Sequence, residues 1–95
     1  MYNVIAILPR GQGVGFSMAG LRVKEVTNVK NAHEVLTEAM EDDNNGVILI
    51  DETYTEEMPP RLRKKVDDSS TPLVVSIPVI TKWEYVMIVR KLSKT

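Results

Sequence analysis

Four short apolar runs along the chain predict four β-strands. Residues 4–8 and 46–51 hold continuous apolar stretches bounded by glycine, proline or polar residues, which is typical of central parallel strands covered on both faces. Residues 73–77 form a third run of this kind between two prolines. In residues 21–26 apolar and charged positions partly alternate, so we expect an edge strand whose basic side chains discourage pairing with other chains.

Helical spacing fills most of the intervals between these runs. In residues 29–40 the apolar positions recur every three or four residues and form one stripe, and Asn28 can cap the start of this helix. Residues 53–66 also have a helical pattern, but they contain Pro59 and Pro60. Because proline cannot donate to the helix ladder, we expect a break there, with Pro60 starting a second helical turn.

The alternation of strands and helices predicts an α/β fold. Since crossovers between parallel strands are right-handed, we expect a small doubly wound, mainly parallel four-stranded sheet flanked by helices, of the flavodoxin or receiver type. We expect one domain overall, with residues 1–78 forming the sheet and residues 79–95 a C-terminal segment. In residues 81–92 we predict a helix, and a strand over residues 85–89 is the alternative because apolar side chains lie on nearly every side.

Composition limits the classes of function. The 95 residues suffice for one domain. With 12 basic and 13 acidic residues the net charge is −1, which lacks the basic excess of a nucleic-acid-binding protein. The absence of cysteine excludes disulfides, thiolate metal sites and cysteine nucleophiles. No apolar run approaches the roughly 20 residues that span a bilayer, and the N-terminus shows no basic leader, so we expect a cytoplasmic protein without direct membrane insertion.

A glycine-rich stretch follows the first predicted strand. Residues 11–15 contain three glycines and resemble the start of the dinucleotide fingerprint Gly-x-Gly-x-x-Gly, but Phe16 stands at its last position. No Gly-Lys-Ser/Thr phosphate loop occurs either. We therefore interpret the stretch as a tight turn that binds no cofactor, followed by a short helix over residues 16–19 that Gly20 ends.

Two polar residues invite a chemical interpretation. Asp51 ends a predicted strand, where a response-regulator receiver carries its phosphoacceptor, but phosphoryl transfer needs Mg²⁺ and further carboxylates. Receivers supply an acidic pair after the first strand, where this chain has residues 8–10, Leu-Pro-Arg. We therefore expect Asp51 to end its strand or cap a helix beside Thr53, and we keep phosphorylation of Asp51 as the second hypothesis.

His33, the single histidine, cannot build a transition-metal site alone and is expected to be a solvated helix residue. We expect no catalytic centre and no metal site.

Several segments match a known family in order and spacing. Residues 15–20 read Gly-Phe-Ser-Met-Ala-Gly, which is similar to the family's Gly-Phe-x-Leu-Ala-Gly after the first strand. Asn-Ala-His-Glu at residues 31–34 opens the second helix, residues 46–52 are similar to a strand with an acidic end, and residues 72–78 match Pro-x-x-x-x-Ile-Pro. Together they resemble the F subunit of the prokaryotic V-type and A-type rotary ATPases. The acids common in the family's first loop are absent, and the match is thin beyond residue 78.

The resemblance implies a non-catalytic subunit of the central rotor shaft. In that family the F subunit clamps onto the coiled coil of the D subunit, beneath the nucleotide-binding subunits. It stabilises the shaft, raises ATP-driven turnover, and is proposed to regulate it through a mobile C-terminal segment, which would reach the nucleotide-binding subunits. The resemblance also implies a cytoplasmic place in the soluble ATPase sector, peripheral to the membrane.

Apolar positions that a small sheet cannot cover are the expected contacts with a partner. A terminal segment that is apolar on more than one face has more surface to bury than such a sheet offers. It can pack as a core helix, bury a face against another protein, or do both. A few buried anchors dominate interfaces of this kind. We expect these anchors to be Val23 in the edge strand and Trp83, Val86 and Val89 in the C-terminal segment.

Overall fold

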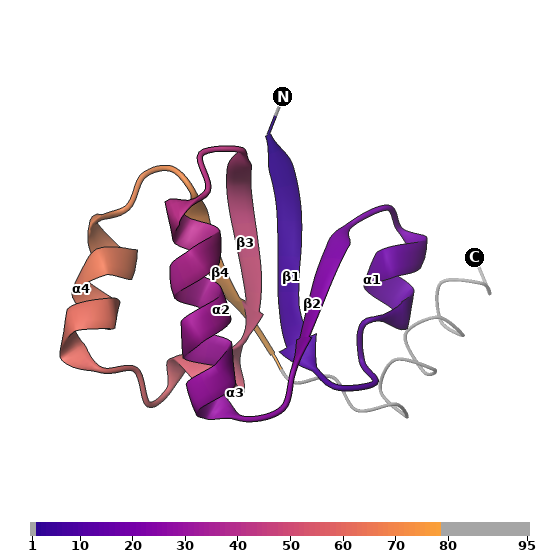
Figure 1. The fold of residues 1–95 in the computed structure, drawn as a ribbon, viewed down its shortest axis with the longest axis horizontal. Coiled ribbons are helices and arrows are strands. Elements are labelled where there is room, and N and C mark those ends of the chain that lie inside the picture. The colour runs from indigo at the N-terminus through magenta and orange to yellow at the C-terminus, as the bar shows by residue number, and fades with distance from the viewer. Residues whose placement is uncertain (1, 79–95) are drawn as a thin grey trace.

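Helices and parallel strands alternate along the chain. The computed structural model describes residues 2–78 (Figure 1). In chain order the elements are β1 (Asn3–Pro9), α1 (Val14–Met18), β2 (Arg22–Val26), α2 (Val29–Glu41), β3 (Asn45–Asp51), α3 (Glu52–Thr55), α4 (Pro60–Asp68) and β4 (Leu73–Ile77). The strands pair in the order β2-β1-β3-β4, and all three pairs are parallel. The predicted α/β class and the edge position of β2 are confirmed.

The strand order reverses between β1 and β3. From β1 the chain first winds outward to β2, and α2 then carries it back across β1 to β3. Because right-handed connections in opposite directions lie on opposite faces of a sheet, α1 lies on one face and α2 and α4 on the other. Figure 1 shows α2 running alongside β3, with α4 next to it. This is the predicted doubly wound arrangement.

The hydrophobic core lies between the sheet and α2. Alternate residues of the two central strands and one stripe of α2 meet there, and α3 and α4 close one side. Each fully buried aliphatic side chain stabilises the fold by about 1.5–3 kcal/mol relative to an exposed one, so this layer is the main source of stability in the described residues. Its buried members are Ile5, Ile7, Val26, Ala32, Leu36, Ala39, Ile48, Ile50, Tyr54 and Leu62.

The start of α2 is fixed by a reciprocal pair of side-chain caps. The Oδ1 of Asn28 accepts a hydrogen bond from the backbone N–H of Asn31 at 2.7 Å. The Oδ1 of Asn31 in turn accepts one from the N–H of Thr27 at 3.2 Å. The first bond satisfies a donor that the first turn of a helix leaves free, and the second ties the residue before the N-cap to that turn. The cap predicted at Asn28 is therefore confirmed.

The helical region after β3 breaks at the two prolines, as predicted. α3 ends at Thr55 and α4 begins with Pro60 as its first helical residue. The Nη2 of Arg63 donates a hydrogen bond to the carbonyl oxygen of Thr55 at 2.6 Å, which joins the end of α3 to α4. Within residues 2–78, every helix is too short or too polar to traverse a lipid bilayer.

Candidate interaction surface

The face of the sheet turned away from α2 is apolar but incompletely buried. Because side chains alternate along a strand, the neighbours of the core isoleucines in β1 and β3 point to this face. Parallel pairing aligns them with alternate residues of the edge strand β4, where Leu73 is 52% and Val75 36% exposed. Monomers rarely leave such contiguous apolar surface in water. We call the residues on this side of the three strands the open face, although Ala6 at its centre is fully buried: Val4, Ala6, Val47, Leu49, Leu73 and Val75.

Helix α1 extends this apolar surface beyond β2. Val23 pairs with Ala6 in the neighbouring strand, so it lies on the same side of the sheet as the open face. Together with Val14 and Met18 of α1 it lines a hollow of about 430 Å³. Val14 is 65% and Met18 84% exposed. The apolar surface therefore continues from the open face onto α1.

Of the predicted partner anchors, Val23 is the one that lies in the described part of the chain. It is half-buried and packs against the turn before α1, because a Cβ added at Gly13 would lie 2.5 Å from its Cγ1. Trp83, Val86 and Val89 lie outside the described residues, so their role stays a prediction. The same holds for the helix predicted over residues 81–92.

A pocket of about 490 Å³ opens at the carboxyl ends of the strands. This end of an open parallel sheet, where the strand order reverses, is where such folds commonly bind ligands. The walls are mainly apolar and include Leu8, Phe16 and Ile77. Asp51 also lines the pocket, although its residue is only 2% exposed. We call this cavity the carboxyl-end pocket.

Asp51 ends β3 and caps α3, as the sequence predicted. Its Oδ1 accepts a hydrogen bond from the backbone N–H of Thr53 at 2.9 Å. Burial, and to a smaller extent the negative charge of Asp51, raises the pKa of the Tyr54 hydroxyl above its usual value. The carboxylate therefore caps a helix and adds to the rise in the pKa of one buried neighbour, Tyr54.

The phosphoacceptor hypothesis for Asp51 gains no support from the described residues. Phosphoryl transfer would require carboxylates gathered around Mg²⁺. In residues 2–78 no three His, Cys, Asp or Glu side chains lie together in a group that could hold a metal ion.

The glycine-rich turn after β1 is held by a carboxylate from β2. The Oε2 of Glu25 accepts hydrogen bonds from the N–H groups of Gly11 at 3.2 Å and Gly13 at 3.3 Å. These amides are the groups that a bound phosphate would need. Gly11 has a φ of +85°, which favours glycine. The interpretation of residues 11–15 as a tight turn is supported, but Glu25, a residue far along the chain, was not predicted to hold it.

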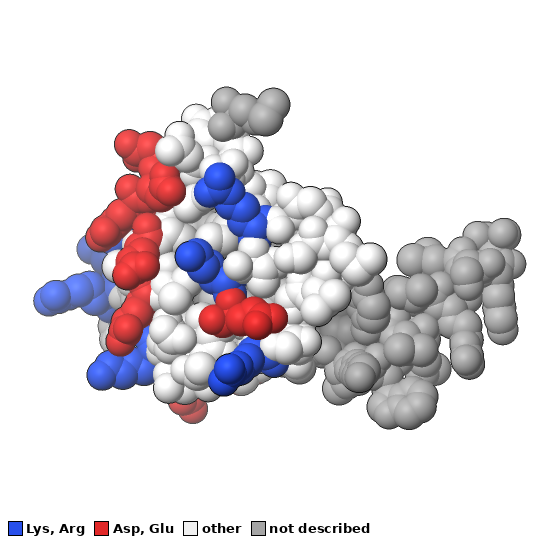
Figure 2. Space-filling view, turned by 45° about the vertical axis from the view of Figure 1, so that its right-hand side comes forward, with Lys and Arg blue, Asp and Glu red and all other residues white. Residues whose placement is uncertain are grey.

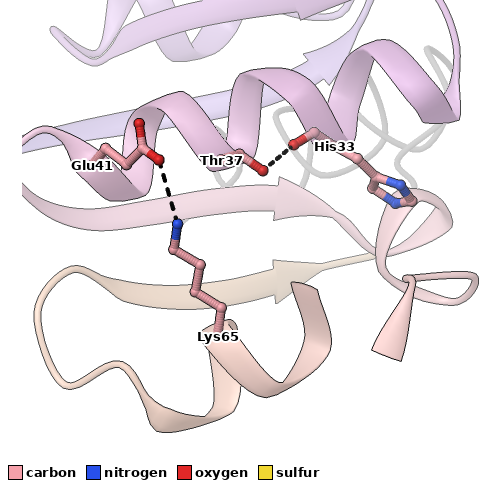
Figure 3. Close-up of polar contacts among 4 residues, drawn as sticks. All are labelled: His33, Thr37, Glu41 and Lys65. Carbon is pink, nitrogen blue, oxygen red and sulfur yellow. Dashed lines mark hydrogen bonds and ion pairs between the residues drawn. The ribbon is translucent and has the colours of Figure 1, made fainter. Parts of the chain in front are cut away.

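His33 is not the solvated residue that the sequence led us to expect. The ring is half-buried, and its Nε2 lies 2.7 Å from the carbonyl oxygen of Tyr54. Since a carbonyl oxygen only accepts hydrogen bonds, Nε2 carries the hydrogen and is the donor of this bond. His33 thereby joins α2 to α3. Figure 3 shows the ring projecting from α2, with the His33 carbonyl bonded to the Oγ1 of Thr37 at 2.9 Å.

Charged side chains gather over α2 and leave part of the surface uncharged. Exposed Glu34, Glu38 and Glu41 follow one side of α2 at helical spacing, and Figure 2 shows acidic side chains as a column on that side. Glu41 also forms an ion pair with Lys65 of α4 at 3.6 Å (Figure 3). In the view of Figure 2, the surface next to the grey residues carries no charge.

The topology and the alternation of elements place the chain in the class of small doubly wound α/β domains. The chain belongs to the family of the ATP synthase (F/14-kDa) subunit, and the model of this family matches residues 6–90. The resemblance noted in the sequence is thereby confirmed.

Individual relatives agree with this assignment. The F subunit of the A-type ATP synthase of Archaeoglobus fulgidus is 31% identical over 65 residues, which are 67% of this chain and 64% of that protein. The corresponding F subunit of Methanocorpusculum labreanum is 29% identical over 65 residues, 67% of this chain and 65% of that protein. The chain thus spans less than two thirds of the length of these curated relatives.

A solved structure supports the fold as well. The crystal structure of the F subunit of the V-type ATP synthase of Archaeoglobus fulgidus superimposes with a TM-score of 0.74 at 25% sequence identity. The match covers 80% of this chain and 96% of that one.

Proposed function

We propose that this chain is a non-catalytic subunit of the central rotor shaft of a V/A-type ATPase and that it binds the coiled-coil D subunit. The open face is the observation that carries the proposal. Its apolar side chains form rows across three strands, and Leu73 and Val75 at its edge are exposed. A helical partner with an apolar stripe is the kind of protein that such a surface fits. Family membership supports the same role.

Interface energetics favour a few anchors on this surface. Leu73, Val75 and Met18 combine apolar character with high exposure, so binding would remove much apolar area from water. Val23 of β2 lines the hollow beside α1 and would lie beneath this contact. In this proposal Trp83, Val86 and Val89 add contacts, and the segment of residues 79–95 reaches the nucleotide-binding subunits. The subunit thereby stabilises the shaft or regulates ATP-driven rotation and ion transport.

Co-elution with the D subunit of the same organism tests this function. Size-exclusion chromatography with light scattering should show a stable one-to-one complex. The double variant Leu73→Ser/Val75→Ser should lose the complex while remaining folded. A matched double variant on the other face of the sheet, Arg22→Ser/Lys24→Ser, should keep it. Two separate peaks from folded wild-type proteins would contradict the proposal.

A further inference from the structure

The carboxyl-end pocket combines apolar walls with one deeply buried carboxylate. Asp51 is 2% exposed, and a carboxylate can accept about four hydrogen bonds. Among residues 2–78, the hydrogen bond to its side chain comes from the N–H of Thr53 alone. The one ion pair found among those residues joins Lys65 to Glu41, on the other side of the sheet. Burying a carboxylate is costly unless a cation or further donors accompany it.

We propose that the carboxyl-end pocket takes an arginine or lysine side chain of the partner subunit, an inference that rests on the proposed function. The apolar stem lies along Leu8, Phe16 and Ile77, and the charged head meets the carboxylate of Asp51. Long basic side chains bind in this way, because their methylene groups cover apolar surface while the head finds a polar partner. At about 490 Å³ the pocket is within the size range of ligand sites.

Other occupants fit this lining less well. Of the described residues that line the pocket, none is basic, and the N–H groups of Gly11 and Gly13 are already bonded to Glu25, so an anion would meet few donors. The same lining residues supply one carboxylate, Asp51, whereas Mg²⁺ is held by several oxygen ligands. An uncharged apolar group would leave Asp51 without a counter-charge among residues 2–78. A cationic head on an apolar stem matches both parts of the pocket.

The pocket lies within reach of a partner seated on the open face. Ile77 follows Val75 by two residues in β4 and therefore lies on the same side of the sheet. Val14 and Met18 of α1, which are highly exposed, also line the pocket. One partner helix that covers these apolar residues can thus insert a basic side chain at the end of the sheet.

The first arm of the test uses the isolated full chain and a side-chain mimic. Titration with n-butylguanidinium chloride, followed by amide NMR shifts, should show binding on the order of millimolar, with the largest shifts at Phe16, Thr53 and Ile77. The uncharged isostere n-butylurea should bind at least about tenfold more weakly. Equal binding of the two probes would overturn the proposal. This comparison uses the wild-type chain and so does not depend on any variant folding.

The second arm compares two variants that change net charge equally. Asn is a good helix cap, so Asp51→Asn keeps the bond to Thr53 while removing the charge. It should abolish the preference for n-butylguanidinium and weaken D-subunit binding at least about tenfold. Exposed Glu52 does not line the pocket, so Glu52→Gln should leave affinity nearly unchanged at about 0.15 M salt. In a double-mutant cycle, replacing one basic residue of the D subunit should weaken binding much less once Asp51 has already been replaced by Asn, because the two side chains interact directly.

The outcomes separate the pocket from the proposed function. If wild-type chain binds the D subunit and Asp51→Asn binds it equally well, the partner side chain is not in the pocket, although the function stands. If the wild-type chain does not bind the D subunit, the proposed function fails. A selective response to n-butylguanidinium would then still establish the cation specificity of the pocket but overturn the D subunit as its source.

Discussion

Two neighbouring residues of β3 point to opposite faces of the sheet, so truncating each of them compares how well the two faces are buried. Ile48→Ala and Leu49→Ala each remove three carbon atoms from the same strand. Ile48 is 0% exposed and packs toward α2, whereas Leu49 is half-buried on the open face. The two variants therefore lose chemically similar atoms, but they lose them from different environments.

The expected cost follows from that environment. A fully buried Ile or Leu truncated to Ala loses about 2–5 kcal/mol, because a cavity remains in addition to the lost transfer free energy. We expect Ile48→Ala to lie in the upper half of this range, since its neighbours belong to the central core. The space left by Leu49→Ala is open to water, so we expect about 1–2 kcal/mol there. At about 4–8 °C per kcal/mol, this difference of about 1.5–4 kcal/mol should separate the two Tm values by roughly 6–30 °C.

Urea unfolding of the isolated chain, followed by far-UV circular dichroism, measures both free energies of unfolding. Equal m-values for the variants and the wild-type chain would show that the comparison is sound. Affinity for the D subunit should follow the opposite order, with Leu49→Ala the more harmful change among folded variants. Equal losses of unfolding free energy would refute the reasoning, because the open face would then be as well covered as the core in the isolated chain.

Three further changes test local contacts. Gly13→Ala should lower the free energy of unfolding by about 1–3 kcal/mol, because its Cβ would meet Val23 at 2.5 Å and Glu25 at 3.0 Å. Chemical denaturation that shows no loss would contradict the packing of this turn. His33→Ala should cost about 1–3 kcal/mol by leaving the Tyr54 carbonyl unpaired, and His33→Gln, which keeps a donor, should cost less; equal costs would argue against the hydrogen bond. The folded-state pKa of Tyr54 is raised, first by burial, above its ordinary value of 10.0. Its contribution is therefore constant below pH 10 and falls as the pH rises toward the folded-state pKa, because the unfolded phenol ionises first. Tyr54→Phe should flatten this alkaline decline, and an unchanged slope would show that Tyr54 does not cause it.

Local patterns were sufficient to predict most elements of the fold. The continuous apolar run of residues 47–50 became the fully paired strand β3, because such a run suits burial on both sides of a parallel sheet. Asn28 and Asp51 act as the predicted helix caps. Pro60 begins α4 because proline is tolerated only in the first turn of a helix. In each case the decisive interaction lies within a few residues along the chain.

The contacts that sequence reasoning missed join distant residues. His33 bonds to Tyr54 across 21 positions, and Glu25 bonds to Gly11 across 14. No local pattern records such pairs, because they arise only when α2 and β2 pack into place. The exposure of Leu73 and Val75 was also not predicted. Their run of apolar residues is equally consistent with a strand covered on both faces.

The central claim is that the partner binds on the side of the sheet that carries the open face and α1. Hydroxyl-radical footprinting with and without the D subunit tests it directly, since solvent exposure controls the oxidation of Met18 and Leu73, which are 84% and 52% exposed. We predict that the D subunit slows oxidation of both residues and leaves that of Met58 unchanged. Met58 is half-buried against the core on the other side. A complex in which Met18 and Leu73 are oxidised as fast as in the free chain would contradict the claim.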